Sequence, residues 1–236
     1  MTNNEKEILG LPIEDRRWPT NKYKNYTNLA IENIEDFWDK EARNLDWYKS
    51  WDKVLEWKNP FAKWFVGGKI NACYNAVDRH IKTEKKTKAA IIWEGEPGDT
   101  RVLTYLDLFR EVNNFASALK KLGIKKGDKI AICMPMIPEF QIAILSAARI
   151  GAIFTVIFSG FSANALAGRI NDSQAKLVIT TDGGYRRGKV IELKNIVDDA
   201  VKETPSVKNV IVYKRVGNDI KMVNKRDHWW DDLVKN

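Results

Sequence analysis

The chain has 236 residues, which is long enough to bury a sizeable core in one or two domains. No apolar run reaches the roughly 20 residues of a membrane-spanning helix, and the N-terminus MTNNEKEILG lacks the apolar segment of a secretory signal. The two cysteines lie far apart and only two histidines are present, so we expect a cytoplasmic protein without a structural metal. The net charge of +8 suggests an anionic partner, either nucleic acid or a phosphate-bearing cofactor, but a solvated basic surface explains most of the lysines better.

The first part of the chain, residues 1–85, is rich in tryptophan and is expected to be a mainly helical N-terminal region. Residues 1–26 are polar without sustained periodicity, which predicts an extended arm. From Ile34 to Trp57 apolar residues recur every three or four positions, which predicts one or two amphipathic helices with the tryptophans in their core. Tryptophans beside lysines can also stack on nucleic-acid bases. A further short helix is predicted over residues 69–82, and its expected inward side chains are Ile70, Cys73 or Tyr74, and Val77.

Residues 86–236 are expected to form an α/β domain, because predicted strands alternate with predicted helices. The strands are apolar on both faces, which indicates a parallel sheet with helices on both sides. The domain begins with a hairpin around the turn residues EGEPGDTR. Glu94, Glu96 and Asp99 could form an acid/base group or a cation site there, but their glycine and proline neighbours favour an exposed turn. The later elements are predicted strands over 129–134, 153–158, 177–181 and 209–213, and predicted helices over 104–122, 138–150, 162–170 and 193–201.

The stretch from Ile153 to Lys189 contains the expected ligand site. Its two strands are apolar, so we expect both to be buried. They are joined by a helix that Ser162 can cap, so we expect them to be parallel. Their carboxyl ends then lie at one edge of the sheet, where open α/β sheets bind ligands. Glycines, arginines and a following helix N-terminus are suited to a phosphate. The residues that converge are Phe158, Ser159 and Gly160 after the first strand, and the loop 182–189 with Arg186, Arg187 and Lys189 after the second.

Two common nucleotide-binding motifs are not found. No strand is followed by G-x-G-x-x-G with a later acidic residue, and there is no G-x-x-x-x-G-K-[ST], so an NAD enzyme and a P-loop NTPase are both disfavoured. The segment GGYRRGK is by itself a weak signal, because basic turns beside glycines are also common on solvated surfaces.

Five separate stretches carry a resemblance to a known family: GGKINACYNAVDRH, WEGEPGDTRVLTY, KIAICMPMIPE, IFSGFSANALAGRINDS and LVITTDGGYRRGK. In this order they resemble the N-terminal part of AMP-forming acetyl-CoA synthetases, ligases of the adenylate-forming superfamily. The resemblance runs from about Ile34 to the HWWDDL tail. It implies that the chain contains the first part of the family's AMP-binding α/β domain. It also implies a reaction in which acetate and ATP give acetyl-adenylate and pyrophosphate, after which the CoA thiol displaces AMP.

The resemblance also implies roles for individual residues. Phe158, Ser159 and Gly160 match the loop beside the adenine of CoA, and Arg186 matches a cation at its 3′-phosphate. Ser159 stands where the family usually has Gly or Ala, and Lys189 where it usually has an arginine. Because Arg187 is an additional cation, either Arg187 or Lys189 is the second phosphate contact.

The family's Ser/Thr/Gly-rich phosphate loop, its acyl-pocket motifs and its C-terminal lysine are not found in these residues. We therefore expect an N-terminal fragment that carries part of the CoA site, no catalytic residue and no activity alone. ATP and Mg²⁺ are expected only for the full-length enzyme, acetate is the default acid, and propionate or a hydroxy acid stays open. The missing remainder is a candidate partner chain, and nucleic acid and membranes are not expected partners. The alternative is a non-catalytic module that binds a phosphorylated ligand or a partner chain.

Overall fold

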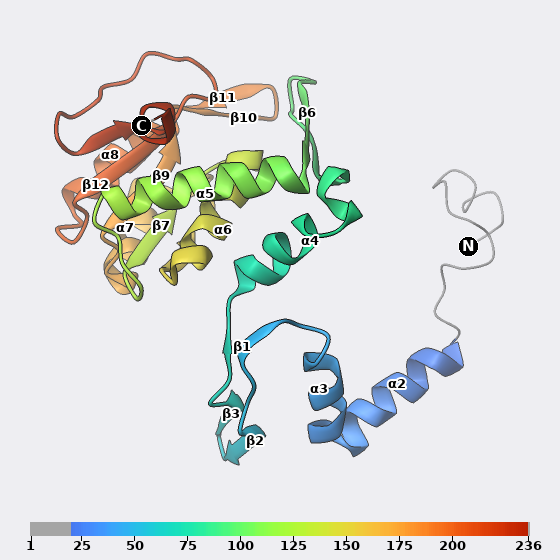
Figure 1. Cartoon of the computed structure of the whole chain (residues 1–236). Helices are drawn as coiled ribbons and strands as arrows, with labels where there is room; N and C mark the ends of the chain where they lie inside the picture. Colours follow the sequence, from blue (N-terminus) through green and yellow to red (C-terminus); the bar gives the residue numbers. More distant parts are fainter. Residues whose placement is uncertain (1–19, 236) are drawn as a thin grey trace. The chain divides into compact units, whose positions relative to one another are not determined.

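The computed structural model describes residues 20–235, and the side chains of residues 24–235. The chain divides into two compact units, residues 1–70 and 71–236, and each is described by itself (Figure 1). Most of the predicted N-terminal arm lies outside the described residues. Where the structure describes it, the prediction of an extended chain is wrong, because helix α2 (Thr20–Glu32) begins there.

The first unit continues with helix α3 (Ile34–Ala42) and then changes to strands. Helices predicted over the second half of Ile34–Trp57 are therefore wrong. Strands suit the β-branched and aromatic residues of this segment, and a partner strand follows within a few residues. Leu55 faces Trp64 across the resulting antiparallel pair. The strands are β1 (Trp47–Lys49), β2 (Lys53–Lys58), β3 (Phe61–Val66) and β4 (Lys69–Ile70).

The aromatic side chains of this unit form a cluster, but none of its described tryptophans is fully buried, so the prediction of a tryptophan core is confirmed only in part. The rings of Trp47 and Trp51 lie 4.9 Å apart, and both contact Phe65. Trp57 and Trp64 are exposed instead. Two of the described tryptophans therefore lie on the surface of the hairpin β2–β3 rather than in a core.

The second unit is built on a five-stranded sheet in which every neighbouring pair is parallel. This confirms the predicted parallel sheet. The order is β13 (Asp227–Trp229), β12 (Asn209–Tyr213), β9 (Leu177–Thr181), β7 (Lys129–Ile132) and β8 (Ile153–Val156).

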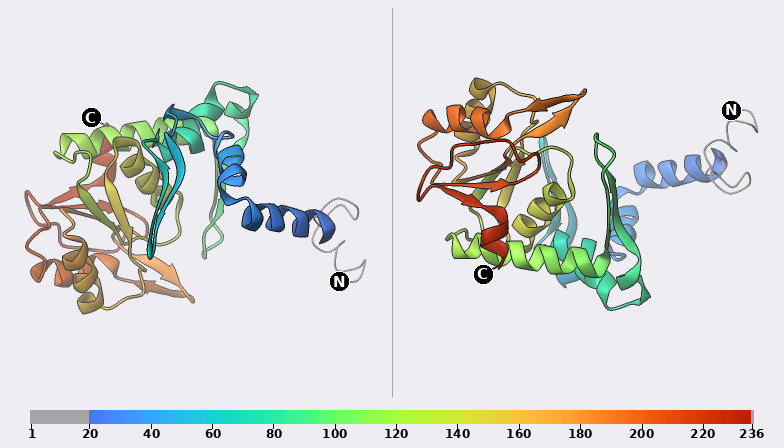
Figure 2. Two further views of the ribbon diagram at one scale, coloured as in Figure 1. Left: turned by 90° about the horizontal axis from the view of Figure 1, so that it is seen from below. Right: turned by 90° about the horizontal axis from the view of Figure 1, so that it is seen from above.

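Helices cover both faces of the sheet, as predicted (Figure 2). Along β7, Ile130 and Ile132 pack on one side with α5 and α6, and Ala131 packs on the other with α7 and α8. Thr104 and Asp107 form the predicted capping box of α5. The helices are α5 (Tyr105–Lys121), α6 (Pro138–Ile150), α7 (Ala163–Ser173), α8 (Leu193–Lys202) and α9 (Trp230–Lys235).

Strand β8 is an edge strand, so the prediction that it is buried is wrong. Ile153, Phe154 and Val156 are exposed, whereas all five residues of β9 are buried. An apolar run predicts a strand but not its place in the sheet, because strand order depends on every other strand.

Shorter elements complete the unit. The helical turn predicted near residues 69–82 spans 72–81 and contains the π-helix η1 (Tyr74–Asp78) and α4 (Arg79–Ile81). Cys73 and Val77 are buried as predicted, but Ile70 lies in β4 and is exposed. A 3-10 turn, η2 (Glu84–Thr87), precedes the confirmed hairpin of β5 (Ala89–Glu94) and β6 (Thr100–Thr104). No helix in residues 20–235 is long and apolar enough to cross a lipid bilayer.

Candidate functional site

Two segments meet at the carboxyl edge of the parallel sheet, where the order of strands and helices predicts a ligand site. The guanidinium carbon of Arg186 lies 4.9 Å from the centre of the Phe158 ring, within cation–π distance. A Cβ atom at Gly160 would lie 2.2 Å from the Nη1 atom of Arg186. Glycine at this position therefore leaves the space that the arginine side chain occupies.

The predicted loop 182–189 is a β-hairpin rather than an irregular loop. Strands β10 (Gly184–Arg186) and β11 (Lys189–Ile191) pair antiparallel, and Arg187 and Gly188 form the turn with φ angles of 52° and 71°. A two-residue turn with positive φ at both positions matches the twist of the two strands. The hairpin projects the cations outward, and all three are exposed.

The hairpin gives Arg187 and Lys189 different positions. Arg186 pairs directly with Lys189 across the hairpin, and directly opposed side chains share one face. Arg187 lies at the tip of the turn. Lys189 is therefore the cation that projects beside Arg186.

A cavity of about 270 Å³ opens beside these segments. It lies where the β5–β6 hairpin, the segment after β7 and the β10–β11 hairpin come together, and Ser159 forms part of its wall. Its other lining residues combine aromatic, acidic and basic side chains: Trp93, Glu94, Gly95, Glu96, Pro135, Met136, Ile137, Tyr185 and Arg215.

Asp182 organises the base of the site. It is fully buried directly after β9, and its Oδ1 atom accepts hydrogen bonds from the backbone N–H groups of Gly183, Arg215 and Val216 at 2.7, 2.7 and 3.0 Å. Its Oδ2 atom accepts one from Gly217 at 2.6 Å. The carboxylate thus fixes the segment that carries Arg215. The sequence analysis placed this residue in the converging loop 182–189 but gave it no role, although an aspartate directly after a buried strand, at the edge where ligands bind, is a usable signal.

Arg215 is a residue of the site that the sequence analysis missed. Its guanidinium lies between the rings of Trp93 and Tyr185, at 5.1 and 5.0 Å, and forms an ion pair of 2.8 Å with Asp99. Hydrogen bonding to Arg215 holds the pKa of the Asp99 carboxyl below its ordinary value. Glu96 accepts a hydrogen bond of 2.5 Å from the backbone N–H of Gly188. The predicted exposed turn is confirmed, and its carboxylates Glu96 and Asp99 pair with the opposite hairpin and with Arg215.

Comparison with known proteins assigns the family. Residues 77–234 match the AMP-binding enzyme family, and residues 23–76 match the acetyl-coenzyme A synthetase N-terminus. The chain belongs to the AMP-binding enzyme family. The two matches meet between residues 76 and 77, and the compact units divide after Ile70. The expected domain boundary after residue 85 stays a prediction.

Relatives of this chain include two acetyl-coenzyme A synthetases. That of Pyrobaculum arsenaticum is 54% identical over 227 residues, covering 92% of this chain and 34% of the relative. That of Chlorobaculum tepidum is 55% identical over 211 residues, covering 89% of this chain and 32% of the relative. Acetoacetyl-CoA synthetase from Streptomyces lividans shares the fold, with a TM-score of 0.81 and 23% identity, over 98% of this chain and 34% of that protein. The chain therefore spans about a third of the length of the relatives it matches.

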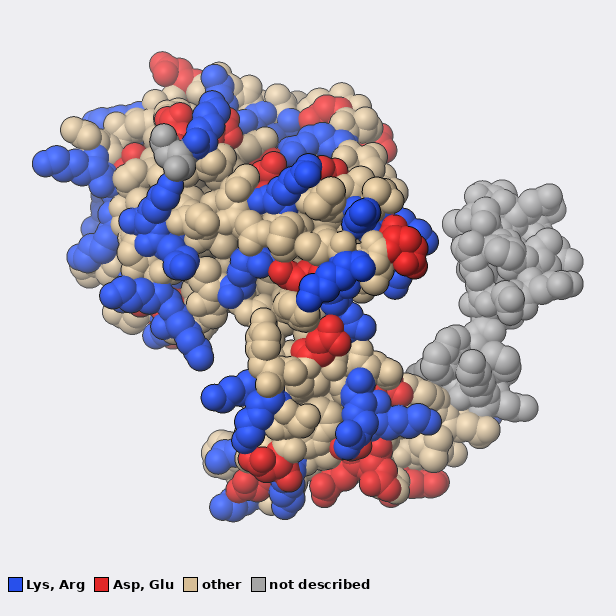
Figure 3. Space-filling model, in the orientation of Figure 1, with Lys and Arg blue, Asp and Glu red and all other residues tan. Residues whose placement is uncertain are grey.

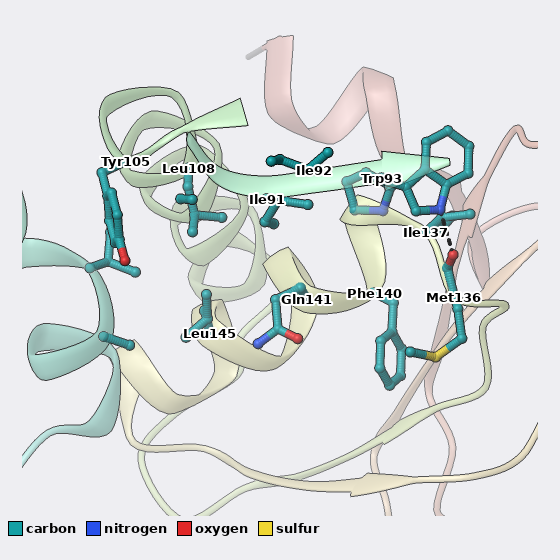
Figure 4. Close-up of a pocket in the computed structure, with 14 residues that line it drawn as sticks. Ile91, Ile92, Trp93, Tyr105, Leu108, Met136, Ile137, Phe140, Gln141 and Leu145 are labelled. Carbon is teal, nitrogen blue, oxygen red and sulfur yellow. Dashed lines mark hydrogen bonds between the residues drawn. The ribbon is translucent and has the colours of Figure 1, made fainter. Parts of the chain in front are cut away.

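A larger cavity of this AMP-binding family member, about 490 Å³, lies between β5 and α6 (Figure 4). The indole N–H of Trp93 donates a hydrogen bond of 2.7 Å to the carbonyl of Met136 at one end. The lining is apolar apart from Gln141 and the Tyr105 hydroxyl, and it includes no carboxylate, imidazole, thiol or amine. Charged groups that could meet a phosphate line the sheet edge instead.

Both cysteines of this AMP-binding family member are buried and free. Burial raises the pKa of the Cys73 thiol to about 11 and that of Cys133 to about 12, which disfavours a thiolate nucleophile. Within residues 20–235 no three His, Cys, Asp or Glu side chains are grouped so that they could hold a metal ion. On the face shown in Figure 3, lysines and arginines are spread among carboxylates rather than gathered in one patch.

Proposed function

We propose that this chain forms the nucleotide-end CoA site of an AMP-forming short-chain acyl-CoA synthetase that acts on acetate. The observation that carries the proposal is the position of Arg186, whose guanidinium lies over Phe158 and fills the space that Gly160 leaves. An exposed arginine beside an exposed ring offers a charge for a phosphate and an apolar face for an adenine. The acetyl-coenzyme A synthetases among the relatives supply the identity of the acid.

In the proposed reaction, the carboxylate of acetate attacks the α-phosphate of ATP and releases pyrophosphate. The CoA thiol then attacks the acyl carbon of the acetyl-adenylate, and AMP leaves. ATP and Mg²⁺ belong to the first half-reaction, and CoA to the second. In this reaction the residues of this chain bind CoA. They contact its 3′-phosphate and adenine, at the end of the molecule remote from the reacting thiol.

Arg186 and Lys189 are proposed as the pair that contacts the phosphate. Their direct pairing across the hairpin puts both cations on one face, whereas Arg187 lies at the tip. A lysine offers a point charge and an arginine a planar fork, so Arg186 is expected to set the geometry and Lys189 to add charge. Lys189→Ala should weaken CoA binding more than Arg187→Ala does, and calorimetry of both variants measures the difference.

Calorimetry with CoA and with 3′-dephospho-CoA tests the site, because the two ligands differ only in the phosphate. Hydrogen bonds to a charged group contribute roughly 1.5–3 kcal/mol, so Arg186→Ala should weaken CoA about 10- to 100-fold. Binding of 3′-dephospho-CoA should change little. Arg110→Ala is the matched control, since it removes an exposed arginine from α5, away from this edge.

Two results would contradict the proposal. Equal affinity of the wild-type chain for both ligands, with strong salt dependence, would indicate a module that binds polyanions through general electrostatics. A steep salt dependence of binding to DNA or RNA would indicate a nucleic-acid-binding protein instead.

The catalytic activity of this chain alone is a further test of the proposed function. The 236 residues contain no Ser/Thr/Gly-rich phosphate loop, so we expect this polypeptide alone to bind CoA without forming AMP. Incubation with acetate, ATP, Mg²⁺ and CoA, followed by AMP measurement, tests this. AMP formation above the level of a sample without the protein would contradict it.

A further inference from the structure

The tips of two hairpins that lie about ninety residues apart in the sequence touch each other. In Figure 1 the β10–β11 hairpin points toward the end of the β5–β6 hairpin, and the view from above in Figure 2 shows the same approach. The contact is a hydrogen bond of 2.5 Å, in which the Gly188 N–H donates to Oε1 of Glu96. Gly188 belongs to the two-residue turn between Arg186 and Lys189.

Arg215 forms a second connection between the same two hairpins. Its guanidinium contacts Trp93 of β5 on one side and Tyr185 of β10 on the other. Its ion pair with Asp99 anchors it to the β5–β6 turn, and its backbone N–H is held by Asp182. Gly95 leaves room for this contact, because a Cβ there would lie 2.7 Å from Nη2 of Arg215 and 2.1 Å from Oδ1 of Asp99.

We infer that Glu96 and Arg215 are positioning residues, which hold the β10–β11 hairpin so that Arg186 and Lys189 meet the phosphate together. The role in ligand binding rests on the proposed function, whereas the connection between the hairpins does not. A two-stranded hairpin alone is marginally stable, so its orientation must be set by contacts outside it. Tyr185 and Gly188, the two residues held by the connection, directly flank the cations in the sequence.

The charge of Glu96 separates this role from simple electrostatics. A carboxylate near an anion site repels the ligand, so electrostatics alone predicts that any neutral replacement of Glu96 tightens CoA binding. Positioning predicts that the nature of the replacement matters. Glu96→Gln keeps an oxygen acceptor for the Gly188 N–H, whereas Glu96→Ala removes it. Glu94→Ala is the control for charge alone, because it removes an exposed carboxylate from the wall of the same cavity, and no hydrogen bond joins the Glu94 side chain to β10–β11 among the described residues.

The first measurement is hydrogen exchange of the Gly188 amide by NMR, without any ligand. Loss of a charge-assisted hydrogen bond at an exposed site should accelerate exchange about fivefold to tenfold in Glu96→Ala. Glu96→Gln and Glu94→Ala should stay within about threefold of the wild type by the same reasoning. Unchanged exchange in Glu96→Ala would overturn the connection between the hairpins, whatever the chain binds.

The second measurement is the ratio of the Kd for 3′-dephospho-CoA to the Kd for CoA, which reports only on the phosphate contact. The ratio should fall about threefold to tenfold in Glu96→Ala and in Arg215→Lys, whereas it should stay the same or rise in Glu96→Gln and Glu94→Ala, which only remove a negative charge. Arg215→Lys keeps the charge but loses the planar group between the two rings. A wild-type ratio near one would refute the proposed function, and with it the positioning of phosphate contacts. A high wild-type ratio that Glu96→Ala leaves unchanged or increases would refute the positioning role alone.

Discussion

Replacing Asp182 by asparagine should destabilise the second unit more than an ordinary polar substitution does. The side chain is fully buried, and its two oxygens accept four backbone N–H groups, three at Oδ1 and one at Oδ2. Asparagine has the same shape but only one acceptor oxygen, and its NH₂ group can only donate. If the amide oxygen replaces Oδ1, the NH₂ group faces the N–H of Gly217, donor against donor.

The expected magnitude follows from these contacts. Losing the part-buried hydrogen bond between the Asp182 carboxylate and the Gly217 N–H costs about 1.5–3 kcal/mol, and the three remaining bonds lose the strengthening that the carboxylate charge provides. Together these effects predict a loss of about 3–4 kcal/mol, a large part of the roughly 5–15 kcal/mol by which a domain is stable. The segment 215–217 should loosen first, because Asp182 holds it directly.

Urea unfolding followed by circular dichroism measures the loss, with Asp199→Asn on α8 as the matched control. Asp199 forms an exposed ion pair with Lys202, and such pairs contribute about 0–1 kcal/mol. With a urea slope of about 1–3 kcal/mol per molar, Asp182→Asn should lower the midpoint by about 1–4 M. If its free energy of unfolding instead stayed within about 0.5 kcal/mol of the wild type, the typical range of neutral surface changes, the role assigned to Asp182 would be wrong.

Three further predictions concern stability and reactivity. Burial, and then the charge of Glu139, raise the pKa of the Glu111 carboxyl in the folded protein; its charged form therefore opposes folding above that pKa, and Glu111→Gln should raise the urea midpoint at pH 7 but not near pH 4. Trp230 is buried and stacks on Phe115 at 3.5 Å, so Trp230→Ala should cost about 3–5 kcal/mol, measured by urea unfolding. Burial raises the pKa of both thiols, to about 11 and about 12, so a thiol reagent at pH 8 should react quickly only after urea is added, and fast reaction of the native chain would contradict this.

The parts of the fold that local signals determine could be predicted from the sequence. Thr104 and Asp107 cap α5 as their spacing indicates, and Gly151 ends α6 in the left-handed conformation. The strands of residues 47–58 could not be predicted in this way, because their tryptophans also fit helical spacing and the deciding partner strand is a separate segment. Likewise, β13 is three residues of a polar segment that pairs with β12, a separate strand earlier in the chain.

The candidate site, like the fold, could be predicted from the sequence only where local signals determine it. Phe158, Gly160 and Arg186 could be brought together from the sequence, because parallel strands joined by helices end at one edge. Glu96 and Arg215 could not, because they reach the site from a hairpin before the sheet and from a segment after β12. Each is a polar residue in a turn, and nothing in its immediate neighbours marks its distant contact.

The strand order explains why a hairpin is needed at this edge. Strands β8 and β9 are not neighbours but lie on either side of β7, so their ends are about 10 Å apart at the usual strand spacing. An arginine placed directly after β9 would have to cross the end of β7 to reach the loop after β8. The β10–β11 hairpin carries the backbone across that distance, and Arg186 at the end of β10 then meets Phe158 and Gly160. An extended hairpin without support would sample many orientations, which is why its two connections to the β5–β6 turn matter for the proposed phosphate contacts beside its turn.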